Sequence, residues 1–287
     1  MSIELGIFAR IFTRRRAEDV ASAIAAAGFG LTQLNLSCLG LPTLPPLGAD
    51  VSFSAIAAAF AAQGVAIWGL SATYNIIHPD VAVRNEGTAR AKALIDRAPM
   101  LGASVVTLCT GTRDPQNMWR AHPGNSSDDA WRDMRASLDQ LLTAAAGSGV
   151  RIGIEPEPGN VVADAARGRR LLDELGHDAG LVGIVLDPAN LVSLETVADQ
   201  DKILRAAFAE LGGQTVALHA KDVVTEGSYG AAGLGQLDYD LIFALHASLS
   251  VPVPVIIQDA VEEDVARTRE FLLSFTTVPG WPTAAGG

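Results

Sequence analysis

The stretch VRIGIEPEPGN (150–160) carries the pattern that decides the fold, a short apolar run that stops at charged residues. The run predicts a buried strand, and each of its two carboxylates, Glu155 and Glu157, is followed by a proline that prevents the chain from continuing as regular structure. One carboxylate at a strand end is commonplace. Two carboxylates there, each followed by a rigid proline, indicate a functional site in which negative charge is held in a fixed position.

Similar β-rich runs recur along the whole chain. They are IELGIF (3–8), LTQLNLS (31–37), VAIWGLS (65–71), SVVTLCT (104–110), LVGIVLD (181–187), TVALHAK (215–221) and PVPVIIQ (252–258). Longer Ala-rich runs with apolar residues at helical spacing lie between them. The clearest of these helix candidates are 17–28, 53–64, 79–102, 127–149 and the region around 164–176.

Several of these helices finish in glycine, as expected of a left-handed helix end before the next strand. The glycines are Gly28, Gly64, Gly102, Gly149, Gly176 and Gly212. Strict alternation of strand and helix predicts a parallel sheet, and eight units in 287 residues predict a closed (β/α)8 TIM barrel. A doubly wound open sheet is the alternative, but residues 6–16 lack the glycine fingerprint that often follows its first strand.

The barrel is expected to form one domain over residues 1–275, because no fixed repeat or linker divides the chain. The tail 276–287 has no periodicity, so it is expected to be flexible or to serve as an arm in a homo-oligomer, a dimer or tetramer. Cys38 and Cys109 do not resemble a disulfide framework, and both are expected to be reduced core residues.

The composition narrows the class of protein. With 49% hydrophobic and 18% charged residues, the chain can bury a large core. It has no apolar stretch near the roughly 18 residues that span a bilayer and no signal-like start, so a soluble cytoplasmic protein is expected. A net charge of −11 opposes binding to nucleic acid or anionic lipid. The one basic cluster, 14–16, is expected to be a solvated loop or helix start.

In a TIM barrel the active site forms at the C-terminal ends of the strands. Four neighbouring predicted strands present polar side chains there, namely Glu155, Asp187, His219 and Gln258. Buried charges cost several kcal/mol each unless they are compensated, so such a cluster predicts a counterion. Oxygen ligands with one nitrogen suit one divalent ion of manganese, magnesium, cobalt or zinc, and the lack of thiolate argues against a closed structural zinc site.

The motifs IEPEPGN (154–160), LDPANL (186–191), HAKD (219–222) and GLGQLDYD (233–240) resemble the xylose isomerase-like sugar phosphate isomerase/epimerase superfamily. The resemblance covers nearly the whole chain in the same order. It implies a metal held by a Glu, an Asp, a His and a final Glu, with the first and last Glu often moving protons on opposite faces of a sugar. These positions fall on Glu155, Asp187, His219 and Gln258. Gln258 departs from the pattern, because an amide can coordinate a metal but cannot abstract a proton.

Other side chains near these motifs have two interpretations each. Glu157 is expected to reach a substrate hydroxyl or the surroundings of the metal, or else to be a solvent-exposed turn residue. Lys221 is expected to be catalytic as an electrophile or hydroxyl contact, with a salt bridge to Asp222 as the alternative. Asn190 either points into the mouth of the barrel as a substrate contact or caps a turn.

Loops on the same face supply further candidates for substrate binding. His78 and His122 follow the third and fourth predicted strands next to aromatic residues, whereas His177 and His246 fall elsewhere. The segment 111–127 is long for such a connection and is a candidate lid. An apolar floor for a sugar ring is expected from Phe8, Trp68 and Trp119, although strand aromatics are more often core residues.

The predicted function is that of a metal-dependent isomerase or epimerase of a small sugar, keto-sugar or polyol acid. Glu155 would abstract a proton next to a metal-bound carbonyl. A lyase, dehydratase or deglycosylating enzyme with the same first step is a serious alternative, as is a non-catalytic sugar-binding relative. An endonuclease of abasic DNA would need more histidine ligands and a basic groove. No phosphate-binding run is evident, which favours a non-phosphorylated substrate.

Overall fold

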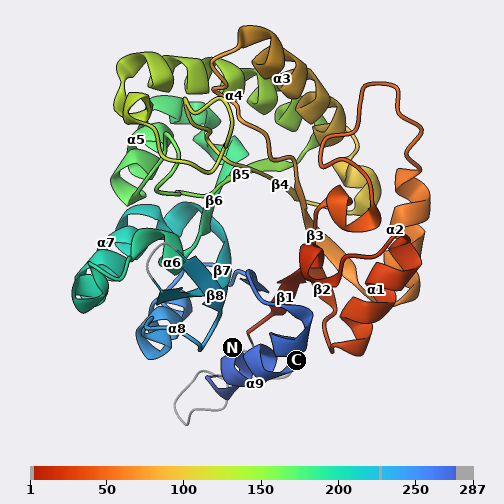
Figure 1. The fold of residues 1–287 in the computed structure, drawn as a ribbon, viewed down its shortest axis with the longest axis vertical. Helices are drawn as coiled ribbons and strands as arrows, with labels where there is room; N and C mark the ends of the chain where they lie inside the picture. The colour runs from red at the N-terminus through yellow and green to blue at the C-terminus, as the bar shows by residue number, and fades with distance from the viewer. Residues whose placement is uncertain (1–2, 226–227, 276–287) are drawn as a thin grey trace.

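The computed structural model describes residues 3–225 and 228–275, and within them a closed barrel of eight parallel strands confirms the predicted fold (Figure 1). The barrel strands are β1 (Leu5–Phe8), β2 (Leu31–Leu34), β3 (Ala66–Ser71), β4 (Val105–Leu108), β5 (Arg151–Ile154), β6 (Val182–Leu186), β7 (Thr215–Thr225) and β9 (Val255–Ile257). They follow one another in chain order, and β9 closes the barrel between β7 and β1.

Helices surround the strands in Figure 1. They are α1 (Ala17–Ala26), α2 (Phe53–Ala62), α3 (Val81–Ile95), α4 (Asp128–Ser148), α5 (Ala165–Leu175), α7 (Gln200–Leu211), α8 (Tyr239–Ala247) and α9 (Val265–Ser274), with one extra turn, α6 (Pro188–Leu191), after β6. None of the helices within the described ranges is both long and apolar enough to cross a membrane. The predicted tail 276–287 lies outside the described residues.

Glycine ends most of the predicted helices as expected. Gly28, Gly64, Gly102 and Gly149 have φ between 69° and 85°, the left-handed region that side chains with a Cβ rarely adopt. Helix α7 also ends at Gly212, as predicted, but the φ of −55° there is not left-handed, and a 3-10 turn, η7 (Gly212–Gln214), follows. Cys38 and Cys109 are free and buried, as predicted.

Glycines inside the barrel make room for bulky neighbours. A Cβ on Gly183 would lie 2.5 Å from Val216, and a Cβ on Gly153 would lie 2.8 Å from Val105. Both distances are far below van der Waals contact, so a larger residue at either position would push neighbouring strands apart. Because successive side chains alternate between the two faces of a strand, Glu155 projects to the same interior face as Gly153.

Strand β7 extends beyond the barrel, which the sequence did not predict. It continues to Thr225 and pairs with an antiparallel strand, β8 (Ser228–Ala231), which forms a hairpin next to the barrel mouth (Figure 1). The buried carboxylate of Asp222 holds the chain that follows, accepting hydrogen bonds from the backbone N–H groups of Val223, Gly233 and Leu237 at 2.9–3.0 Å. The hairpin is therefore anchored to the strand that carries His219.

Candidate active site

Four polar side chains meet at the C-terminal ends of adjacent strands. Glu155 follows β5, Asp187 follows β6, His219 lies on β7, and Gln258 follows β9. Since β5, β6 and β7 are hydrogen-bonded parallel neighbours, their ends lie at one edge of the barrel. One ligand atom each from Glu155, Asp187 and His219 lies within 4.8 Å of the others. These three side chains form a group that could hold a metal ion.

The unpaired atoms of this group fit a cation. Asp187 Oδ1 accepts a hydrogen bond from Ala189 N–H at 2.9 Å, which caps α6, and Asp187 Oδ2 is buried with the Lys221 ammonium 3.1 Å away. His219 Nδ1 and Gln258 Oε1 are buried without a hydrogen-bond partner. Buried acceptors are rarely left unpaired, and a divalent ion would give His219 Nδ1 and Gln258 Oε1 a partner while sharing Asp187 Oδ2 with Lys221.

The orientation of His219 is set by Gln33, which was not among the site residues predicted from the sequence. His219 Nε2 lies 2.9 Å from Gln33 Oε1, across the barrel interior from β7 to β2. The amide nitrogen of Gln33 donates to the hydroxyl oxygens of Ser71 and Thr107, each at 3.3 Å. Because an amide oxygen only accepts, His219 carries a proton on Nε2, and its Nδ1 lies 3.3 Å from Glu155 Oε2.

Lys221 supplies the positive charge nearest to this group. Its Nζ lies 3.1 Å from Asp187 Oδ2 and 3.6 Å from Asp259 Oδ2, and 4.0 Å from the centre of the Tyr229 ring. Only 4% of the Lys221 surface is exposed. The alternative bridge to Asp222 does not form, because that carboxylate is bonded to the backbone instead. Lys221 therefore faces the site, where its ammonium can reach a substrate oxygen.

Burial opposes the charged form of these groups, and their neighbours decide the outcome. Burial would raise the pKa of Glu155, but the attraction of His219 and Lys221 lowers it to about 2. Burial, with repulsion from Glu155, raises the pKa of Glu157 to about 8. Burial also raises the pKa of Asp187 to about 6, and Lys221 opposes that rise. At neutral pH Glu155 is thus an acceptor, whereas Glu157 keeps its proton and can donate it.

Two predicted substrate contacts lie beside Glu155. Asn190 Nδ2 donates to Glu155 Oε1 at 2.7 Å, so this amide fixes the direction of the carboxylate. Glu157 Oε2 accepts from Asn160 Nδ2 at 3.1 Å, and Asn160 Oδ1 in turn accepts from Gly111 N–H. Glu157 is half-buried rather than an exposed turn residue. Contact of either side chain with substrate stays a prediction.

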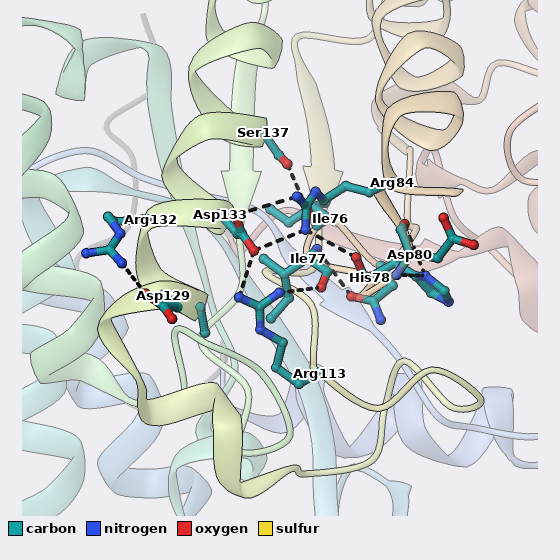
Figure 2. A network of polar contacts seen from close by, with 12 residues as sticks. Ile76, Ile77, His78, Asp80, Arg84, Arg113, Asp129, Arg132, Asp133 and Ser137 are labelled. Atoms are coloured by element: carbon teal, nitrogen blue, oxygen red, sulfur yellow. Dashed lines mark hydrogen bonds and ion pairs between the residues drawn. The ribbon is translucent and has the colours of Figure 1, made fainter. Parts of the chain in front are cut away.

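His78 belongs to a network that braces a loop (Figure 2). The guanidinium groups of Arg84 and Arg113 both bind Asp133 Oδ2, at 3.1 and 2.7 Å, and donate to the backbone carbonyls of His78 and Ile77. The His78 ring itself accepts from Asp80 N–H through Nδ1 and lies 3.2 Å from a backbone carbonyl through Nε2. Both ring nitrogens are thus engaged by the backbone, and these contacts give no support to the predicted role in substrate binding.

The candidate lid 111–127 is tied to the loop after β5. Asn125 Nδ2 donates to Gly159 O at 3.0 Å. His122 is exposed, and its Nδ1 caps a short turn by accepting from Gly124 N–H. Trp119 is 49% exposed and therefore has a free ring face. Its contact with substrate, like that of His122, stays a prediction.

Phe8 lies beneath the site, at the end of β1. It packs with Ala217, Ile256 and Leu31, and Trp68 borders the same small cluster. Ala217 precedes His219 by two residues on β7, so both side chains point to the interior of the barrel. Phe8 and Trp68 are therefore interior core residues. Phe8 is also placed where its ring could make an apolar contact beneath a bound ligand.

The profile of the family described as Xylose isomerase-like TIM barrel matches residues 21–259. A search of curated protein sequences finds no match to the chain.

Solved structures share the fold. The chain is similar to the 3-keto-D-glucoside 4-epimerase YcjR from E. coli, with a TM-score of 0.75 and 16% identity over 95% of this chain and 99% of that one. A D-allulose 3-epimerase from Methylomonas sp. in complex with D-allulose has a TM-score of 0.68 and 18% identity over 93% and 89%. A xylose isomerase-like TIM barrel protein from Mycobacterium smegmatis in complex with magnesium has a TM-score of 0.69 and 19% identity over 96% and 97%.

Proposed function

Because the chain belongs to the xylose isomerase-like TIM barrel family, we propose that it is a metal-dependent isomerase or epimerase of a small sugar, keto-sugar or polyol acid. The observation that carries the proposal is the meeting of Glu155, Asp187 and His219 within 4.8 Å, beside two buried atoms without a hydrogen-bond partner, His219 Nδ1 and Gln258 Oε1. The similar structures include epimerases of keto-glucoside and allulose and a magnesium complex, which supports this choice of substrate and cofactor.

One divalent ion would be held by Glu155, Asp187 and His219, with Gln258 as a fourth or more distant ligand. Manganese, magnesium, cobalt and zinc all suit this set of donors. When bound, such an ion polarises a substrate carbonyl and lowers the cost of removing the neighbouring proton.

Side chains of the protein would carry out the proton transfer and bind the substrate. Glu155, held by Asn190 at 2.7 Å, takes the proton from the carbon beside the carbonyl. Lys221 donates a hydrogen bond to a substrate oxygen, and Glu157, protonated at neutral pH, donates to a hydroxyl. Phe8 and Trp119 would provide apolar contacts for the sugar ring.

A lyase is the second candidate, and Gln258 favours it. An enzyme that inverts a carbon needs, besides the base, a second group that returns a proton on the opposite face of the sugar, and the amide of Gln258 cannot serve as that group. A lyase needs only Glu155 to take the proton and an acid to protonate the departing hydroxyl or glycosyl oxygen. Protonated Glu157, with a pKa raised to about 8, can be that acid.

The test combines metal analysis with proton exchange. The purified protein is analysed for metal content, and proton NMR in heavy water then follows a panel of keto-sugars with and without chelator. We expect about one metal ion per chain and metal-dependent loss of one substrate proton signal, with product that identifies an isomerase or a lyase. A protein that binds no manganese, magnesium, cobalt or zinc and exchanges no proton would contradict the proposal.

A further inference from the structure

A groove of about 370 Å³ opens next to the candidate active site. Three segments form it: the loop after β5 with Pro158 and Ala163, the chain from Asn190 to Thr196 around the end of α6, and the β7–β8 hairpin with Val223 and Tyr229. We call it the rim groove. Its volume lies within the range of small-molecule sites, roughly 300–1,000 Å³.

We propose that the rim groove binds the second ring of a glycoside whose first sugar lies at Glu155. The inference deepens the proposed function, on which it rests, by naming the class of substrate. It makes the preferred substrate a sugar that carries a further ring through a glycosidic bond, rather than a free monosaccharide.

Two residues connect the groove to the site. Asn190 lines the groove while its Nδ2 holds the Glu155 carboxylate at 2.7 Å. Tyr229 also lines the groove, and its ring lies 4.0 Å from the Lys221 ammonium. The rim groove and the candidate active site therefore share Asn190 as a border, and Tyr229 connects the groove to the Lys221 ammonium.

The walls suit a ring with an apolar face and a few hydroxyl groups. Leu191, Val192, Leu194 and Val223 give aliphatic contacts, and Tyr229 is 41% exposed and can stack on a ring. Asn190 is 3% exposed, and its Oδ1 is buried without a hydrogen-bond partner, so this amide can accept one more hydrogen bond.

The charge of the groove excludes a phosphate in this position. Its lining residues, all within the described part of the chain, include no lysine or arginine, and Asp164 adds a negative charge. Tight phosphate binding draws on arginine, lysine or a helix N-terminus, and here Asp164 already caps the start of α5. A neutral second ring fits the groove better than an anionic group.

The experiment uses matched ligands and matched variants. Isothermal titration of the purified protein measures binding of the methyl and phenyl β-glycosides of D-glucose, D-galactose and D-xylose. In at least one sugar series we expect the phenyl glycoside to bind about tenfold or more tightly than the methyl glycoside. Ala163→Phe fills the groove and should remove this preference. Ala166→Phe makes the same change at an exposed position of α5 outside the groove and should keep it.

A second groove variant, Ser193→Phe, replaces an exposed residue from another segment, and thermal melts confirm that each variant is folded. Equal binding of methyl and phenyl glycosides in all three series, or a preference that survives both groove variants, overturns the proposal. So does light scattering that shows Ala163→Phe dissociating an oligomer, which would make the groove an interface. Failure of the proposed function would appear separately, as a lack of proton exchange in heavy water. The preference for phenyl over methyl glycosides is a binding property and does not depend on turnover.

Discussion

Replacing Gln33 with methionine tests whether the barrel interior orients a metal ligand. Methionine is close to glutamine in size, so the change removes polar atoms and leaves little cavity. In the variant, His219 Nε2 loses the acceptor that lies 2.9 Å away. Ser71 and Thr107 lose an amide donor but keep the 3.3 Å hydrogen bond between their hydroxyls.

The magnitude follows from the burial of these partners. Gln33 is 3% exposed and His219 is 2% exposed, so water cannot replace the lost bond. One stranded donor costs about 1–3 kcal/mol of unfolding free energy. Removing a partner that orients a metal-ligating histidine typically weakens metal binding about 10- to 100-fold, because the ring is free to turn or change tautomer.

Competition with a chromogenic chelator measures the manganese and zinc affinities of each variant, and chemical denaturation measures its stability. Thr107→Val is the matched control, since it breaks a bond on the far side of Gln33 and leaves the bond to His219 intact. Gln33→Met should lose stability and metal affinity, and Thr107→Val should lose only stability. Metal affinity within twofold of wild type in Gln33→Met, or an equal loss in both variants, would refute this reasoning.

Three further predictions concern titratable or charged positions. Glu155→Gln should slow heavy-water exchange by about two to four orders of magnitude, whereas Glu157→Gln should mainly raise KM; equal effects would mean that the roles are wrongly assigned. Gln258→Glu should bind manganese more tightly in chelator competition, since it adds a negative ligand; weaker binding would place residue 258 away from the metal. Burial lowers the pKa of His246, so the stability that this neutral ring contributes is present above about pH 6.5 and is lost as the pH falls. His246→Gln should therefore lose less unfolding free energy between pH 7 and 5 than wild type, and identical slopes in denaturation series would contradict this.

The barrel could be predicted because its signal is local. Each strand is a short apolar run, each helix has its own period, and strand order in a TIM barrel follows chain order. The convergence of Glu155, Asp187 and His219 followed from the same rule, since all strands end at one face. No knowledge of side-chain contacts was needed for either prediction.

The missed features depend on contacts between distant segments. Gln33 is one polar residue in the otherwise ordinary strand β2, and only the closed barrel brings it to His219, 186 residues away. Tyr229 lies on a hairpin that the alternation of strands and helices does not predict. His78 has a loop position typical of a ligand contact, and the sequence did not show the two hydrogen bonds that its ring makes with the backbone; its contact with substrate stays a prediction. A sequence pattern can place a side chain on a face without showing which neighbour satisfies it.

Charge balance offers a physical reason for glutamine at position 258. Asp259 is the only non-glycine residue within the described ranges that has a positive φ, 51°, and its carboxylate lies 3.6 Å from the Lys221 ammonium. The formal charges of the Glu155, Asp187 and Asp259 carboxylates and the Lys221 ammonium sum to −2, so the proposed divalent ion brings the total to zero. A carboxylate at 258 would add a buried negative charge that no further cation offsets, which is costly in such a setting. The amide would keep an oxygen ligand there without that charge, and Glu155 would remain the one carboxylate that accepts the substrate proton.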